Sequence, residues 1–154
     1  MLIRKAIISD TEALLPLYQG SLVHMANLQP RQYREVPQDI AFVQKGIVDE
    51  NADILVAEEN GEIIGLASVF YEELSSKPYR VALNFVELDT LFVSEYHRRK
   101  GVGTALFRAA QQWAKERDAQ SLQLITLGEN TYARQFYERM GMQELIVKYI
   151  KEEL

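Results

Sequence analysis

The chain has 154 residues, of which 47% are hydrophobic and 25% charged, and a length of this kind is most simply one domain over residues 1–154. It contains no cysteine and only two histidines, which excludes disulfides, thiolate catalysis and cysteine metal sites and leads us to expect no metal. The formal net charge of −5 disfavours nucleic-acid binding, and no apolar run approaches the roughly 20 residues that span a membrane, so we expect a cytoplasmic protein.

The N-terminal part predicts a strand followed by two helices. Leu2 to Ile8 is the strand, and Ser9 with Glu12 forms a capping box that begins the first helix. Pro16 lies inside that helix and predicts a kink or a late start. After a polar loop, a second helix is predicted from near Pro37 to about Asp49.

Three strands follow. The runs Asp53–Glu58 and Glu62–Tyr71 are rich in β-branched residues and are joined through Asn60-Gly61. An Asn-Gly pair adopts the positive φ angles of a tight turn, so these two strands should form a hairpin. A long strand is predicted from about Arg80 to Val93.

The rest of the chain alternates between helix and strand. An amphipathic helix runs from Gly101 to near Arg117, Ser121–Leu127 alternates as a strand, and a short helix at Thr131–Met140 ends at Gly141. Gln143 to Ile150 is the predicted last strand. The order β-α-α-β-β-β-α-β-α-β describes a mixed α/β domain, in which a crossover helix makes the fourth and fifth strands parallel.

A basic turn between the fourth strand and the third helix is a candidate anion site. Arg98 to Thr104 reads R-R-K-G-V-G-T, and its glycines allow close approach to backbone N–H groups at a helix start. A dinucleotide fingerprint would need a glycine at the position of Leu106. A Walker A loop has its lysine after the second glycine, whereas Lys100 precedes both glycines in this chain. The alternative is a simple bend with solvated charges, but the flanking strand and helix favour the anion site.

Two carboxylates precede this turn. In a regular strand, Glu87 and Asp89 share one face with the apolar Leu91 and Val93, and burial would raise their pKa toward the range of a general base. The alternative is a bulge between Leu83 and Leu91, which would turn one acid to solvent.

Asn130 and Tyr137 are the remaining candidates. Asn130 follows a strand end and is a good helix N-cap, which alone explains it. Tyr137 shares an apolar face with Phe136 and Met140, so core packing is its simplest role. A phenol could nonetheless protonate a departing thiolate.

Three motifs in this order resemble the GNAT family of N-acetyltransferases. Residues 98–103 match its Q/R-x-x-G-x-G/A signature, and L-F-V at residues 91–93 and N-x-x-A-x-x-F-Y-x-x-x-G-M at residues 130–142 also match. The resemblance covers nearly the whole chain. It also implies that the fourth and fifth strands splay apart around a bulge.

The resemblance implies that an acetyl group moves from acetyl-CoA to a primary amine of a small molecule or peptide by direct attack. Glu87 is the preferred base, Asp89 its substitute, and Tyr137 the candidate acid, without a metal. The basic turn would hold the pyrophosphate of coenzyme A. The implied cofactor contacts are Leu91, Phe92, Val93, Arg98, Arg99, Lys100, Gly101, Val102, Gly103, Thr104, Asn130, Ala133 and Phe136.

A protein that binds acyl-CoA without catalysis could have the same anion site. A non-catalytic acyl-CoA sensor or assembly module needs the cradle but no acid or base, so Glu87, Asp89 and Tyr137 favour an enzyme. The resemblance places the acceptor near residues 25–37 and 72–80, whose mixed side chains identify no ligand. The last strand or the N-terminal helices could form a homodimer.

Overall fold

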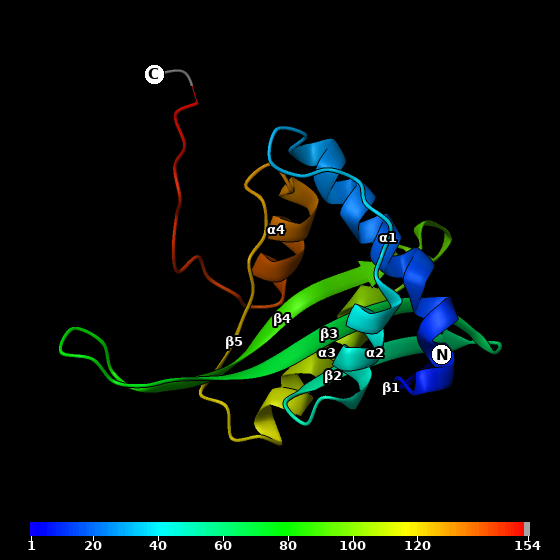
Figure 1. The fold of residues 1–154 in the computed structure, drawn as a ribbon, viewed down its shortest axis with the longest axis horizontal. Helices are drawn as coiled ribbons and strands as arrows, with labels where there is room; N and C mark the ends of the chain where they lie inside the picture. The colour runs from blue at the N-terminus through cyan, green and yellow to red at the C-terminus, as the bar shows by residue number, and fades with distance from the viewer. Residues whose placement is uncertain (153–154) are drawn as a thin grey trace.

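The computed structural model describes residues 1–152, which form one mixed sheet with helices on both faces (Figure 1). The strands are β1 (Leu2–Lys5), β2 (Ala52–Glu59), β3 (Glu62–Leu74), β4 (Leu83–Val93) and β5 (Ser121–Gln123), and they lie in that order. Neighbours are antiparallel except β4 and β5, which are parallel as the crossover helix predicted. The mixed α/β fold class is confirmed.

The tight turn between β2 and β3 is also confirmed. Asn60 has a φ of 53° and Gly61 a φ of 82°, which are the left-handed conformations that an Asn-Gly hairpin requires. The strands that it joins are longer than predicted, because β3 continues to Leu74.

The helices are α1 (Thr11–Leu28), α2 (Ile40–Val48), α3 (Val102–Lys115) and α4 (Thr131–Arg139). Short 3-10 turns precede α1 and α3, at Ile8–Asp10 and Glu95–His97. Two apolar clusters form the core. One joins α1 and α2 to the sheet, and the other joins α3 and α4 to its opposite face.

The helix starts differ from the predictions in detail. Asp10, rather than Ser9, is the N-cap of α1, and its carboxylate accepts a hydrogen bond from the Ile7 N–H at 2.8 Å. The second helix begins at Ile40 instead of near Pro37, because Asp39 caps it by accepting from the Ala41 N–H at 2.9 Å. Pro16 lies inside α1 and does not delay its start.

The predicted last strand is wrong. Residues 143–150 belong to no strand and run away from the sheet beyond α4 (Figure 1). β5 also ends at Gln123 instead of Leu127. Both differences have one physical cause, since a segment becomes a strand only where another backbone pairs with it.

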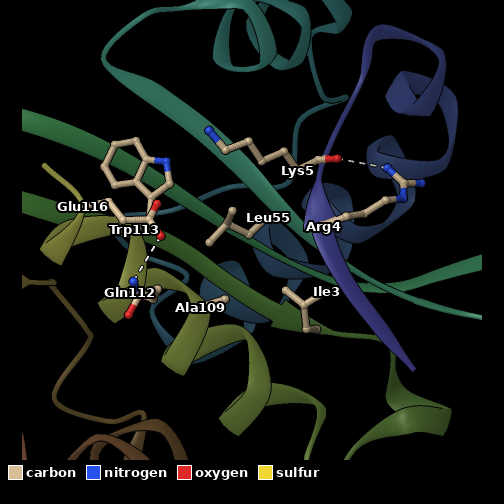
Figure 2. Close-up of a pocket in the computed structure, with 8 residues that line it drawn as sticks. All are labelled: Ile3, Arg4, Lys5, Leu55, Ala109, Gln112, Trp113 and Glu116. Carbon is tan, nitrogen blue, oxygen red and sulfur yellow. Dashed lines mark hydrogen bonds between the residues drawn. The ribbon is translucent and has the colours of Figure 1, made fainter.

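The surface of this fold includes two shallow hollows. A hollow of about 190 Å³ is lined by β1, β2 and α3 at the sheet edge opposite β5 (Figure 2). A larger hollow of about 450 Å³ lies beside the far end of the β3–β4 hairpin, next to Leu83 and Gln120. Within residues 1–152, no helix is long and apolar enough to cross a membrane.

Candidate functional site

The site is organised by the separation of β4 from β5. Their parallel pairing covers three positions, from Phe85 with Ser121 to Glu87 with Gln123. Beyond that point β4 continues to Val93 while the chain after β5 diverges from it (Figure 1). The splayed pair that the resemblance implied is therefore present, and it leaves one edge of residues 88–93 open.

A bulge in β4 lies at Asp89. Val69 of β3 pairs with Leu88 and Ser68 pairs with Thr90, so Asp89 has no partner opposite it. The sequence left a bulge open as the alternative to a regular strand. Because the bulge is present, the prediction that both acids share a face with Leu91 and Val93 is wrong.

The two acids nevertheless stay on one face. Val86 and Leu88 pack in the cluster on the α3 side, so the intervening Glu87 points to the α1 and α2 side. Asp89 also points there, because its carboxylate lies 3.4 Å from the Ser68 hydroxyl and accepts from Thr90 at 3.0 Å. The bulge returns Leu91 and Val93 to the α3 side, and it leaves Asp89 exposed to solvent, as the alternative predicted for one acid, while Glu87 is partly buried.

Glu87 is the acid whose environment resists ionisation. Partial burial raises its pKa above 4.5, and the negative charges of Asp89 and Glu72 raise it further. A carboxyl group shifted in this direction is better suited to accept a proton near neutral pH.

Sequence reasoning missed two polar residues beside these acids. Tyr18 of α1 is 5% exposed and Ser68 of β3 is 2% exposed. Burial, with a smaller contribution from the Asp89 charge, raises the pKa of Tyr18 to about 12, and a hydrogen bond with Ser68 opposes that shift. A serine inside the apolar run of β3 was the available signal.

The basic turn has the geometry of an anion cradle. Arg99 and Gly101 adopt left-handed φ angles of 59° and 83° just before α3 begins. The first hydrogen bond of α3 runs from the Ala105 N–H to the Gly101 carbonyl at 3.0 Å. In the described part of the chain, the N–H groups of residues 99–104 have no hydrogen-bond acceptor. Six unpaired donors and the positive helix end therefore meet at one place.

The side chains of the turn divide between two directions. Arg98 folds back onto β4, where its Nε donates to the Val93 carbonyl at 3.1 Å and its guanidinium lies 5.3 Å from the centre of the Phe92 ring. Arg99 and Lys100 remain exposed. Arg99 and Lys100 therefore place positive charge beside the cradle, and within residues 1–152 neither forms a salt bridge with a carboxylate.

Helix α4 lies next to the cradle. A Cβ placed on Gly103 would be 3.8 Å from Cζ of Phe136 and 3.9 Å from Cγ2 of Val93, so α3, α4 and β4 meet there. Asn130 is the N-cap of α4, as predicted, and its Oδ1 accepts from the Ala133 N–H at 3.2 Å.

Tyr137 combines core packing with an available hydroxyl. Its ring centre lies 5.3 Å from that of Phe136 and 6.1 Å from that of Phe107. Burial raises its pKa to about 12. The raised pKa keeps the hydroxyl protonated near neutral pH, and among residues 1–152 the hydroxyl has no hydrogen-bond partner and is not fully buried.

The candidate residues therefore lie on both sides of the splay. The cradle, Phe136 and Tyr137 are on the α3 and α4 side, whereas Glu87 and Asp89 are on the α1 and α2 side. The two hollows described above contain none of these residues, which lie along the separation of β4 from β5.

A family model described as the acetyltransferase (GNAT) family matches residues 15–142. The chain belongs to the GNAT family. An uncharacterized N-acetyltransferase of Bacillus subtilis, YhfO, is 33% identical over 148 residues, covering 94% of this chain and 91% of that one. Streptothricin acetyltransferase of Streptomyces lavendulae is 30% identical over 122 residues, covering 70% and 60%. This GNAT protein is thus an acetyltransferase.

Solved structures share the GNAT fold over the full length. A mutant BH1408 protein from Bacillus halodurans has a TM-score of 0.95 at 22% identity and covers all of both chains. Aminoglycoside N-acetyltransferase AAC(6')-Iy, in complex with CoA, has a TM-score of 0.73 at 20% identity over 98% of this chain and 94% of that one. Family membership implies the use of acetyl-CoA.

Proposed function

We propose that this GNAT enzyme moves an acetyl group from acetyl-CoA to a primary amine of a small molecule or peptide. The observation that carries the proposal is the row of unpaired N–H groups at residues 99–104, at the mouth of the β4–β5 separation. A pyrophosphate satisfies such donors, and a pantetheine arm fits an unpaired strand edge. Leu91, Phe92 and Val93 supply that edge.

In this proposal the separation of the strands joins two halves of one site. The turn at Arg98–Thr104 binds the pyrophosphate on one side of the sheet, with Asn130, Ala133 and Phe136 alongside it. The acceptor amine approaches from the other side, where Glu87 and Asp89 lie. The open backbone of residues 91–93 polarises the thioester carbonyl between them.

Proton transfer is assigned to three side chains. An alkylammonium with a pKa near 10 must lose a proton before its nitrogen can attack, and Glu87 accepts it directly or through water. Asp89 lies close enough for its charge to act on Glu87, and it is the alternative candidate for the base. Tyr137 donates a hydrogen bond, then a proton, to the sulfur that leaves with coenzyme A.

Two observations support a cationic small molecule as acceptor. The charges of Asp89 and Glu72 both act on Glu87, so three carboxylates lie near one another on this part of the sheet. A cationic amine would be attracted to it. The names of the streptothricin and aminoglycoside acetyltransferases show that relatives of this fold act on such compounds.

The test measures release of free thiol from acetyl-CoA with a panel of amines, polyamines, aminoglycosides, amino acids and short peptides. We expect release with at least one cationic amine, and its loss in Glu87→Gln but not in Glu62→Gln, an exposed carboxylate of β3. Coenzyme A should also raise the Tm, whereas ATP and NAD should not. No Tm shift with coenzyme A would overturn the assigned cradle.

A further inference from the structure

Two side chains that carry hydroxyl groups, Tyr18 of α1 and Ser68 of β3, lie buried behind the exposed carboxylate of Asp89. Thr11 is also buried, but its hydroxyl donates to the Ile8 carbonyl of its own turn at 2.6 Å, so its burial has a local explanation. The Ser68 hydroxyl instead donates to Asp89, 21 residues further along the chain. A buried hydroxyl aimed at an exposed carboxylate of the proposed site calls for an explanation of its own.

The bulge in β4 brings Asp89 to these hydroxyl groups. Ser68 pairs with Thr90, so the unpaired Asp89 lies beside that pair. Oγ of Ser68 lies 3.4 Å from Oδ2 of Asp89, and Oγ1 of Thr90 donates to the same oxygen at 3.0 Å. Within residues 1–152, Oδ1 of Asp89 accepts no hydrogen bond and forms no salt bridge. The protein therefore holds one oxygen of this carboxylate and leaves the other available to a ligand.

The hydrogen bonds run in one direction, from the core to the surface. Burial raises the pKa of Tyr18 to about 12, so its phenol keeps its proton near neutral pH and donates to Ser68. Ser68 then donates its own proton to the carboxylate of Asp89. The Tyr18 ring itself is fixed in the core cluster beneath α1, and it meets the Phe42 ring of α2 edge-on at 6.2 Å. We call this series of bonds the hydroxyl chain.

We propose that Tyr18 and Ser68 are positioning residues for acetyl transfer, which hold Asp89 so that its Oδ1 binds the ammonium group of the acceptor. The inference rests on the proposed function, and it separates the roles of the two acids. Asp89 binds the amine, whereas Glu87, which no hydroxyl group holds within residues 1–152, accepts the proton. The freed nitrogen lone pair forms the N–C bond as the C–S bond of the thioester breaks, and the sulfur takes the Tyr137 proton.

This arrangement suits an ammonium group for two reasons. A primary alkylammonium carries three N–H donors, so it can bond to a free carboxylate oxygen and still present a proton to a second acid. The hydroxyl chain also restricts rotation of an exposed aspartate before the amine arrives, so less side-chain entropy is lost on binding. A separation of 3.4 Å is long for a hydroxyl–carboxylate bond, and bonds of this kind at active sites commonly shorten when substrate binds.

Steady-state kinetics provide the first test, with the amine that gives the highest rate in the thiol-release panel. Tyr18→Phe and Ser68→Ala should each raise the KM for that amine about tenfold and leave kcat within about twofold. The KM for acetyl-CoA should not change. Tyr71→Phe is the matched control, because its hydroxyl donates to Glu73 at 3.0 Å while its ring packs on the α3 side. A lower kcat with an unchanged amine KM in Tyr18→Phe would show a structural role and overturn the proposal.

Two further variants show whether the effect passes through Asp89. Thr11→Val removes the other buried hydroxyl, so it should lower the Tm without changing the amine KM. In Asp89→Ala, adding Tyr18→Phe or Ser68→Ala should have no further effect on the amine KM, because both act through the missing carboxylate. A full tenfold effect that persists in Asp89→Ala would overturn the proposal.

NMR of tyrosine labelled at Cζ tests the hydroxyl chain without turnover. The Tyr18 signal, identified by its loss in Tyr18→Phe, should move in Ser68→Ala and in Asp89→Asn. Glu73→Gln should move the Tyr71 signal alone. A Tyr18 signal that does not respond to Asp89→Asn would overturn the hydroxyl chain even in an active acetyltransferase. Wild-type protein that releases no thiol with any amine would instead overturn the proposed function, and the NMR shifts would still decide the hydroxyl chain.

Discussion

Glu87 is the carboxyl group of the proposed site whose ionisation the surrounding structure opposes. Burial first, and then the charges of Asp89 and Glu72, raise its pKa above 4.5. If Glu87 is the base, kcat/KM should rise with pH through this shifted pKa and level off above it. Asp89→Asn removes one negative charge, so the acid limb of the profile should move to lower pH. A limb that stays in place in Asp89→Asn would contradict the assignment.

The same shift predicts a stability change with a defined sign. Because the folded-state pKa of Glu87 is raised, its contribution to stability is full below the unfolded value of 4.5 and is lost as pH rises through the folded pKa. Glu87→Gln should therefore raise the Tm at neutral pH. The gain should stay below about 1 kcal/mol, since the side chain is only partly buried and its charge is screened by solvent. At pH values below 4.5 the two proteins should melt together.

Tyr137 contributes its ring to the core and its hydroxyl to the proposed chemistry. Tyr137→Phe keeps the packing against Phe107 and Phe136, so the fold and the affinity for coenzyme A should be unchanged. Turnover should fall by roughly 10² if the hydroxyl protonates the leaving sulfur. The pKa of about 12 keeps this proton in place across the assay range. Unchanged kcat in Tyr137→Phe would leave core packing as its whole role.

At the scale of elements, α1 packs closely against β4 because Gly20 has no side chain. A Cβ on Gly20 would lie 2.7 Å from Cζ of Phe92, so Gly20→Ala must displace a ring that also stacks under Arg98. We expect a loss of roughly 1–3 kcal/mol in unfolding free energy and weaker coenzyme A binding. Gly46→Ala in α2 is the matched control, because its Cβ would be 3.4 Å from Ile54. Equal stability of the two variants would contradict this packing.

The elements that sequence predicts well are those that local chemistry determines. Asn60-Gly61 sets the hairpin through its own φ angles, and the apolar spacing of α3 sets its buried face. The parallel β4–β5 pair followed from the crossover alone. The unpaired donors at residues 99–104 were likewise expected from a glycine-containing turn before a helix.

The elements that sequence does not predict depend on distant partners. The bulge at Asp89 arises from pairing with β3, so alternation along β4 could not reveal which side chains share a face. Residues 143–150 have the composition of a strand, yet they form none in the described structure because no sheet edge pairs with them. Tyr18 and Ser68 join the site for the same reason, since the packing of α1 brings Tyr18 near Asp89 and the pairing of β3 with β4 brings Ser68 there.

At the scale of the whole molecule, one cluster ties the first strands to the helix that begins at the cradle. Asp53 of β2 accepts a hydrogen bond from Nε1 of Trp113 in α3 at 2.6 Å, and Lys5 of β1 lies 2.6 Å from the same carboxylate. The Arg117 guanidinium lies 3.5 Å from the centre of the indole ring. Trp113 is the single tryptophan and is 2% exposed. Its fluorescence should therefore report unfolding of the whole domain.

Asp53→Ala would leave the buried indole N–H without its acceptor. The cost of an unpaired buried donor is about 1–3 kcal/mol, so the urea midpoint should fall while the slope m is unchanged. Lys5→Ala removes only a 56% exposed partner of the same carboxylate and should cost less than about 1 kcal/mol. Both variants are compared by Trp113 fluorescence and circular dichroism at one protein concentration. A larger loss in Lys5→Ala than in Asp53→Ala would show that the surface charge, and not the indole hydrogen bond, holds β1 and β2 to α3.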